Sequence, residues 1–256
     1  MKNLLTMFIV CLTISFSSQS FGQSMPQIFG KPPINYSGSD VLAITFKTTP
    51  KVIKQLVPKP MVAVDSQLIT INMAFHRVPD RQDYYEMFIS IPVTVNGKKG
   101  NYHPLVYLDK TAPTVAGREV WGFPKIDGSF KLEKEIDKIH FSLSRNGTNL
   151  LEFSSSLSEP ISDVFETEII EGFVIKEIPS VDGSDTPDLH RLNSYISRNT
   201  KVYEIQLANN IDFQLSESEK DFFPNIPVVD VIDAKLFKLD FILDYGEIEY
   251  DYLKEK

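Results

Sequence analysis

Hydrophobic and polar positions alternate along much of this chain, and that period of two residues predicts β-strands. Residues 68–75 alternate β-branched and polar side chains, and residues 87–95 form a long apolar run that contains Pro92. Asn96-Gly97 is typical of a hairpin turn, so the apolar run is expected to fold back onto residues 102–108. Further strands are expected at residues 139–143, 150–154, 173–178, 202–207 and 236–243.

Only one helix is indicated, and it is short. Thr48-Thr49-Pro50 provides a threonine in the capping position and a proline at the first helical position. Apolar residues at positions 52, 53 and 56 give the helix one buried face, and Pro58 ends it. Many strands and few helices predict a mainly β domain, closed into a barrel or built from stacked sheets.

The first 22 residues have the pattern of a signal peptide. Lys2 precedes an apolar stretch over residues 4–16, and Ser20-Phe21-Gly22 offers a cleavage site between small residues. The apolar stretch is short for a permanent membrane span, although an uncleaved anchor is the alternative. We therefore expect a signal peptide at 1–22, an extended arm at 23–37 and one domain at 38–256. The cleaved protein is expected to be periplasmic or secreted, without stable membrane insertion.

Composition excludes several classes of function for the cleaved chain. Lys2 is the only charged residue among the first 22, so 25 basic and 34 acidic residues remain, which disfavours nucleic acid as a partner. Cys11 is the only cysteine and lies in the signal peptide, which rules out a thiol nucleophile and a cysteine metal site. The four histidines have no metal-ligand spacing, so no metal site is expected. An anionic substrate would need local cations, and Lys125 and Arg118 are the candidates.

The segment from Gly117 to Lys125 reads Gly-Arg-Glu-Val-Trp-Gly-Phe-Pro-Lys and carries the main candidate for chemistry. A lysine amine in water has a pKa near ~10.4 and is almost entirely charged at neutral pH. Burial favours the neutral form, which can attack a ketone to form a Schiff base whose iminium withdraws electrons. The structural alternative is a lysine that lays its stem on apolar residues and keeps its ammonium in water.

This segment closely resembles the active-site segment of the acetoacetate decarboxylase family, a standard example of an activated lysine. Other short motifs follow the family's order and spacing from about Val41 to Lys254. They are Val57-Pro58-Lys59-Pro60, Tyr85-Glu86, Ile91-Pro92-Val93, Asn96-Gly97-Lys98-Lys99-Gly100, Tyr107-Leu108-Asp109 and Tyr250-Asp251-Tyr252-Leu253-Lys254.

The resemblance implies a fold and a set of site residues. The fold would be a closed antiparallel or mixed β-barrel with a few short helices outside and a deep pocket that contains the lysine. The protein would form a homo-oligomer. Lys125 would form the Schiff base and Glu86 would move protons, with no cofactor required because the iminium is the electron sink. Arg118, Glu119 and Phe123 would bind a small keto acid. Arg118 and Glu119, expected in a loop, have a structural ion pair as their alternative role.

Three positions depart from the decarboxylase pattern. Ile126 stands where decarboxylases carry a second lysine, and a gapless alignment places Ser39 at the position of an arginine that binds the substrate carboxylate. The same alignment places Ile71 where a further acidic residue lines the pocket. These departures leave the lysine in place and leave the substrate open.

Three functions follow. The first is a Schiff-base lyase that decarboxylates a small β-keto acid of the acetoacetate type. The second is an aldolase-dehydratase, in which a pyruvate-derived enamine on the same lysine attacks an aldehyde. The third is an exported ligand-binding protein that keeps the pocket and does not turn over its ligand.

Overall fold

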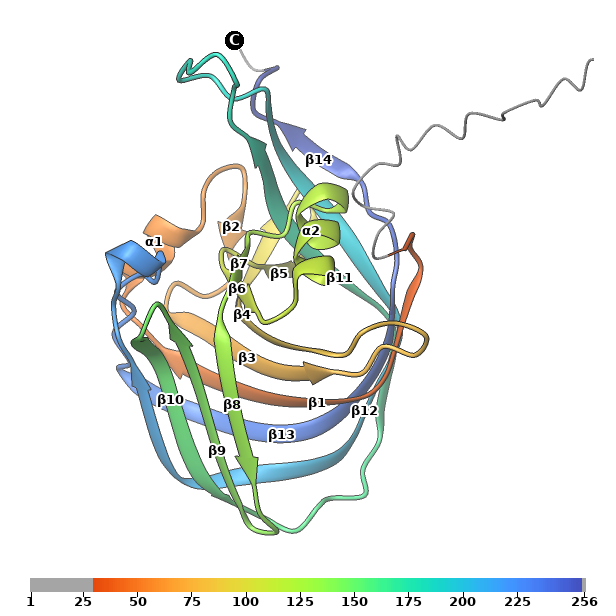
Figure 1. Ribbon diagram of the computed structural model, residues 1–256, viewed down its shortest axis with the longest axis vertical. Coiled ribbons are helices and arrows are strands. Elements are labelled where there is room, and N and C mark those ends of the chain that lie inside the picture. Colours follow the sequence, from red (N-terminus) through yellow and green to blue (C-terminus); the bar gives the residue numbers. More distant parts are fainter. Residues whose placement is uncertain (1–29, 255–256) are drawn as a thin grey trace, which may run out of the picture.

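The computed structural model describes residues 30–254, and in this part of the chain a ring of strands closes on itself (Figure 1). Closure occurs because β11 pairs with both β5 and β12, and the parallel β11–β5 pair makes the otherwise antiparallel ring mixed. The predicted mainly β barrel is therefore confirmed. The ring runs in the order β11 (Phe165–Ile178), β5 (Lys98–Tyr102), β4 (Tyr84–Val95), β3 (Leu68–His76), β1 (Ile34–Lys47), β13 (Asp230–Leu243) and β12 (Leu189–Leu215).

A second layer continues from the far end of β12. Residues 208–215 of this long strand pair with β10 (Thr148–Leu157), which pairs in turn with β9 (Lys138–Arg145) and β8 (Ser129–Lys134). These three strands pass across the outer face of β3, β1 and β13 (Figure 1). Short strands complete the sheet: β2 (Val62–Ala63), β6 (Val106–Leu108), β7 (Lys125–Asp127) and β14 (Ile248–Asp251).

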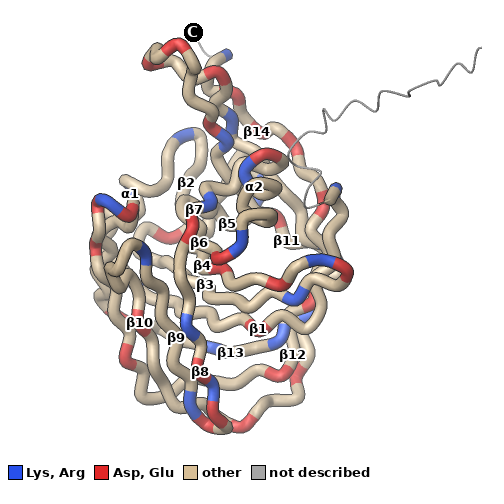
Figure 2. Tube along the Cα trace, viewed as in Figure 1, with Lys and Arg blue, Asp and Glu red and all other residues tan. Residues whose placement is uncertain are grey.

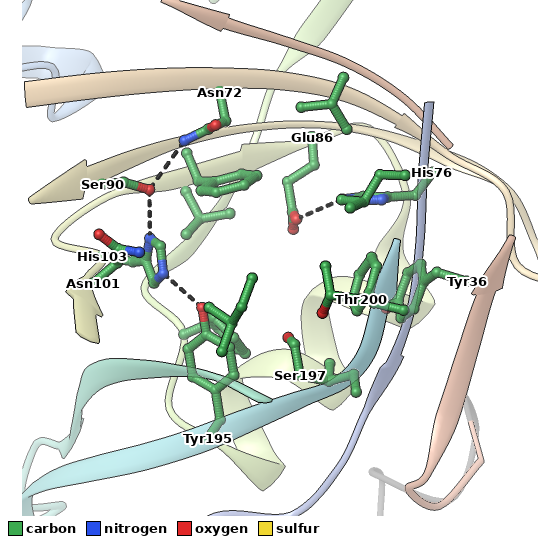
Figure 3. A pocket seen from close by; sticks show the side chains of 18 of the residues that line it. Tyr36, Asn72, His76, Glu86, Ser90, Asn101, His103, Tyr195, Ser197 and Thr200 are labelled. Carbon is green, nitrogen blue, oxygen red and sulfur yellow. Dashed lines mark hydrogen bonds and ion pairs between the residues drawn. The ribbon is translucent and has the colours of Figure 1, made fainter. Parts of the chain in front are cut away.

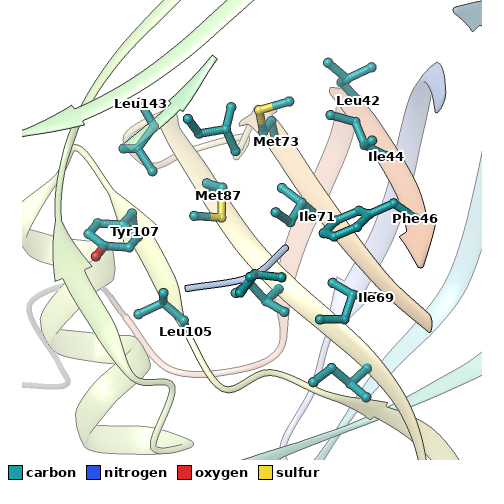
Figure 4. Close-up of a cluster of buried hydrophobic side chains, with 14 of the residues drawn as sticks. Leu42, Ile44, Phe46, Ile69, Ile71, Met73, Met87, Leu105, Tyr107 and Leu143 are labelled. Carbon is teal, nitrogen blue, oxygen red and sulfur yellow. The ribbon is translucent and has the colours of Figure 1, made fainter. Parts of the chain in front are cut away.

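The main hydrophobic core lies between the two layers (Figure 4). Alternate residues of β1, β3 and β4, including Phe46, Ile71 and Met87, face away from the interior of the ring and pack against Phe141 and Phe153 of the second layer. The intervening residues of the same strands face the interior of the ring. The alternation seen in the sequence thus separates a hydrophobic core outside the ring from the side chains that face its interior.

The expected hairpin forms between β4 and β5, with Asn96 and Gly97 at φ values of 51° and 84°. Residues 102–108 were expected as one strand, but they divide between the end of β5 and β6. Pro104, which has no backbone N–H, lies in the break. The sheet also begins earlier than expected: Ile34 opens β1, so residues 34–36 of the predicted arm pair with β13. The predicted signal peptide lies outside the described residues.

Helix α1 (Pro50–Leu56) begins and ends where the sequence predicts, although the side chain of Thr49 makes no capping hydrogen bond. Helix α2 (Thr111–Val120) was not expected, and the prediction of a loop at Arg118 and Glu119 is wrong. Ala116 of α2 and Trp121, which comes directly after the helix, pack into a second buried cluster. Tertiary packing rather than helix propensity therefore stabilises α2. Neither helix in residues 30–254 is long and apolar enough to cross a membrane.

Charged residues are spread over the barrel. Lys and Arg are interspersed with Asp and Glu along the outer strands, without a long run of basic residues in the described part of the trace (Figure 2). Several of these charges are paired, as in Arg198 with Asp244 at 2.7 Å.

Candidate active site

Lys125 opens β7 and points into a cavity inside the ring. The strand pairs in parallel with β6, where Lys125 lies opposite Val106. Because side chains alternate along a strand, Lys125 lines the cavity while Ile126 packs against the hydrophobic core. Only 8% of Lys125 is exposed, so its amine lies away from bulk water.

Gly117 of α2 packs directly against this lysine. A Cβ atom at position 117 would lie 2.6 Å from Cε and 3.0 Å from Nζ of Lys125. The amine also lies 3.4 Å from the carbonyl oxygen of Pro113, to which it donates, and 5.4 Å from the ring centroids of Tyr84 and Phe123. The first glycine of the lysine motif therefore makes room for the stem, and two aromatic rings face the ammonium.

Glu86 of β4 forms an ion pair with the amine. Its Oε1 lies 2.9 Å from Nζ of Lys125, and its Oε2 lies 3.2 Å from Nε2 of His76. Burial by itself raises the pKa of Glu86, but the nearby Lys125 and His76 outweigh burial and lower that pKa to about 2. Glu86 is therefore ionised at neutral pH and lies within proton-transfer distance of the amine.

Lys125 and Glu86 both line a cavity of about 220 Å³, and Figure 3 shows Glu86 projecting into it. Pockets for drug-sized ligands typically measure ~300–1,000 Å³, so this one suits a small metabolite. Aromatic side chains form much of its wall, among them Tyr36, Phe88 and Phe241. Among the described residues that line it, Lys125 is the only lysine or arginine.

His103 holds a second group of polar side chains in the cavity wall (Figure 3). Its Nδ1 lies 2.9 Å from the carbonyl oxygen of Ile89, which can only accept a hydrogen bond, so Nδ1 carries the proton. Nε2 then accepts a hydrogen bond from the hydroxyl of Tyr195 at 2.6 Å. Burial lowers the pKa of His103 to about 4 despite the Ile89 carbonyl and Glu86, so the ring is neutral at physiological pH.

His103 and Tyr195 are cavity residues that the sequence did not single out. His103 counted only as one of four scattered histidines, although its place before Pro104 marks the end of a strand. Tyr195 lies in a part of β12 where no strand was expected, so no local pattern pointed to it. Their shared hydrogen bond depends on β5 and β12 meeting across β11, which only the closed ring provides.

The predicted substrate-binding residues separate into two groups. Phe123 lines the cavity and packs against Tyr195 with ring centroids 4.8 Å apart. Arg118 and Glu119 are exposed in the last turn of α2 and do not line it. Arg118 donates to the carbonyl oxygen of Lys125 at 3.1 Å, and the carbonyl oxygen of Glu119 accepts from Lys176. These contacts favour structural support over substrate contact for Arg118 and Glu119, through hydrogen bonds to backbone carbonyls and not through the expected ion pair.

The structure also revises the three departures from the decarboxylase pattern. Placing Ile71 at a pocket position is wrong, because β3 turns Ile71 into the hydrophobic core and its neighbour Asn72 into the cavity. A shift of one residue along a strand changes the face, and a gapless alignment cannot detect it. Ser39 is fully buried and its Oγ accepts from the backbone N–H of Arg77 at 3.2 Å. Ile126 faces the core rather than the amine.

The arrangement as a whole can receive a small carbonyl compound next to a lysine and a carboxylate. Within residues 30–254, no three His, Cys, Asp or Glu side chains come together as potential metal ligands. The chemistry available from the side chains themselves is therefore that of an amine with an adjacent proton acceptor, inside a mostly apolar wall.

Comparison with known proteins agrees with this geometry. The family model described as acetoacetate decarboxylase (ADC) matches residues 20–253. Acetoacetate decarboxylase 3 of Mesorhizobium japonicum is 30% identical over 234 residues, covering 89% of each chain. The crystal structure of acetoacetate decarboxylase from Legionella pneumophila shares the fold with a TM-score of 0.80 at 21% identity, covering 94% of both chains. The enduracididine biosynthesis enzyme MppR complexed with pyruvate has a TM-score of 0.73 at 16% identity, covering 87% of this chain and 92% of that one. The chain belongs to the acetoacetate decarboxylase family.

Proposed function

We propose that this protein is a cofactor-independent lyase that decarboxylates a small β-keto acid of the acetoacetate type through an iminium on Lys125. The observation that carries the proposal is the buried ion pair between Nζ of Lys125 and Oε1 of Glu86, 2.9 Å apart inside the cavity. Membership of the family and the relatives named acetoacetate decarboxylase support the same reaction class.

Formation of the iminium uses both members of the pair. Glu86 takes a proton from the ammonium, and the neutral amine attacks the ketone carbon. The carbinolamine then loses its hydroxyl as water, with the proton returned by Glu86. The product is a protonated iminium beside a carboxylate, so the pair keeps its opposite charges.

The iminium then draws electrons from the bond that breaks. The bond between the α-carbon and the carboxylate cleaves, carbon dioxide leaves, and the electron pair converts the iminium into a neutral enamine. Glu86, which lies beside the nitrogen, is placed to relay a proton to the enamine carbon. Water then hydrolyses the iminium, which releases the ketone and restores the lysine ammonium.

Borohydride trapping tests this proposal. Purified protein is incubated with acetoacetate or pyruvate, reduced, weighed intact and mapped by peptides. Lys125→Ala removes the amine, and Lys125→Arg keeps a cation beside Glu86 but cannot form a Schiff base. We expect a substrate-sized mass increase on Lys125 that both variants abolish. A protein that gains no mass with either acid, while a control enzyme labels, would contradict Schiff-base chemistry on these substrates.

A second fate of the enamine is supported by one specific observation. The positions where decarboxylases carry an arginine and a second lysine are Ser39 and Ile126, and Lys125 is the only lysine or arginine among the described lining residues. A pyruvate-derived enamine attacking an aldehyde is the corresponding aldolase-dehydratase reaction. Carbon dioxide release from acetoacetate distinguishes decarboxylation from carbon–carbon bond formation between pyruvate and an aldehyde. Retention of a ligand without either product would indicate the binding protein instead.

A further inference from the structure

Two hydroxyl groups in the cavity wall have no part in the chemistry described above. Ser197 and Thr200, both on β12, line the cavity and lie across it from Glu86 (Figure 3). Thr200 is 3% exposed, and its Oγ1 has no hydrogen-bond partner among the described residues. A buried hydroxyl without a partner is unfavourable, and a ligand that accepts its hydrogen bond removes that penalty.

An irregularity in β12 aims both hydroxyls into the cavity. Residues three apart in a regular strand point to opposite faces of the sheet. Here the register against β13 shifts between Arg198 and Lys201, so β12 carries one additional residue, and Asn199 takes a φ of 51°. Bulges of this kind redirect side chains and are common next to active sites. The bulge brings Ser197 and Thr200 to the same face.

Two polar groups on the His103 side of the wall are already engaged. The Tyr195 hydroxyl donates to His103, and the Ser90 hydroxyl accepts from the Asn72 amide at 3.0 Å. Lys125 is committed to the ketone in the proposed reaction. Ser197 and Thr200 therefore offer hydroxyl donors that a second polar group on the substrate can use.

We infer that Ser197 and Thr200 form the subsite for the substrate's carboxylate, which they bind through neutral hydroxyl donors instead of a cation. This inference rests on the proposed function, and it defines the substrate class as a keto acid whose ketone meets Lys125. Neutral donors suit decarboxylation, because the carboxylate loses its charge as carbon dioxide forms.

Two four-carbon probes separate the subsite from the lysine. Butyrate has the carboxylate without the ketone, and butanone has the ketone without the carboxylate. Thr200→Val and Ser197→Ala remove the hydroxyls. Thr48→Val is the matched control, because Thr48 is also fully buried with an unpaired Oγ1 but lies outside the cavity lining.

We expect Thr200→Val to weaken butyrate binding, followed by calorimetry, by about tenfold or more, because a hydrogen bond to a charged group is lost. The rate of borohydride trapping with acetoacetate should fall by a similar factor. Trapping with butanone should stay within about twofold of the unmodified protein, and Thr48→Val should change none of these values.

Equal butyrate affinity in Thr200→Val and the unmodified protein would overturn the subsite, as would a parallel loss of trapping with acetoacetate and butanone. Failure of the proposed function has a different signature. In that case neither ketone traps on Lys125, while butyrate still binds the unmodified protein and loses affinity in Thr200→Val. Because removing an unpaired buried hydroxyl relieves a cost, the variant should fold at least as stably as its parent.

Discussion

Replacing Gly117 by alanine is expected to displace the Lys125 amine while leaving the barrel folded. The new Cβ would lie 2.6 Å from Cε and 2.7 Å from Cδ of Lys125, and 3.0 Å from its Nζ. All three atoms belong to the far end of one flexible side chain, so the lysine can move without disturbing the backbone of α2. The clash is therefore expected to displace the lysine amine and not to unfold the protein.

The size of the effect follows from these distances. Ordinary contacts of a Cβ atom begin at 3.4 Å, so the lysine must retreat by roughly 1 Å from its present position. A misplacement of about 1 Å in a reacting group can lower the rate on the order of 10²-fold. Alanine is more favourable than glycine by ~1 kcal/mol inside a helix, which offsets the cost of moving the side chain. We expect a melting temperature within a few degrees of the unmodified protein.

Single-turnover borohydride trapping with acetoacetate measures the loss, and thermal unfolding measures the fold. Thr111→Ala, at the exposed start of the same helix, is the control for a substitution in α2 away from the lysine. Trapping at the normal rate in Gly117→Ala would refute the reasoning, because the lysine would then reach its reactive position without the space that Gly117 provides. An unfolded Gly117→Ala variant would also contradict the reasoning, because it would show that the new Cβ displaces the backbone and not the lysine side chain.

Four further outcomes are expected. Glu86→Gln keeps the shape of the side chain but cannot accept the lysine proton, so trapping should slow by roughly 10²-fold or more at unchanged protein concentration. Burial raises the pKa of Glu86, but Lys125 and His76 lower it overall from 4.5 to about 2, so Glu86 stabilises the fold above pH 4.5 and loses this effect toward pH 2. The free energy of unfolding of Glu86→Gln, measured by denaturant titration, should vary less with pH between 4.5 and 2 than that of the unmodified protein. Burial lowers the pKa of His103 from 6.5 to about 4, so stability should fall between those values on acidification, and His103→Gln should remove that slope. Protein recovered from a cell envelope or medium should begin at Gln23 by intact mass, whereas a chain that retains residues 1–22 would contradict signal cleavage.

The strand pattern of the outer core was predictable because those strands bury one face in a continuous hydrophobic layer. Residues 68–75 and 87–95 alternate for this reason, and both expected strands form as β3 and β4. The wall of the cavity breaks the rule, since its interior face carries polar groups. Residues 193–200 of β12 read Asn-Ser-Tyr-Ile-Ser-Arg-Asn-Thr and show no apolar period, so the strand was expected only over 202–207. The pattern fails in this segment of β12, which carries Tyr195, Ser197 and Thr200 of the cavity wall.

The candidate site was predictable to the extent that its residues belong to a contiguous motif. Lys125 and Gly117 occur in one segment, and Glu86 belongs to the short Tyr85-Glu86 motif. The sequence therefore indicated the segments in which all three residues lie. Their packing depends on α2, whose glycine, threonines and proline do not favour a helix. His103, Tyr195 and the bulge at Asn199 are set by pairings between distant strands, which no local pattern encodes.

The unusual feature of this cavity is how its charge is distributed. Glu86 and Lys125 neutralise each other at one wall, the hydroxyls of Ser197 and Thr200 lie across the cavity from Glu86, and burial keeps His103 neutral. In the proposed reaction the lysine amine and a ketone form an iminium, whose positive charge stays close to Glu86 and next to the bond that must break. The carboxylate is held by neutral donors, so the bond that joins it to the α-carbon can break and give its electron pair to the iminium without an ion pair being broken first. The same distribution disfavours a substrate with a second negative group, because no other lysine or arginine among the described lining residues would compensate it. This distribution of charge therefore favours small monoanionic keto acids as substrates of the proposed reaction.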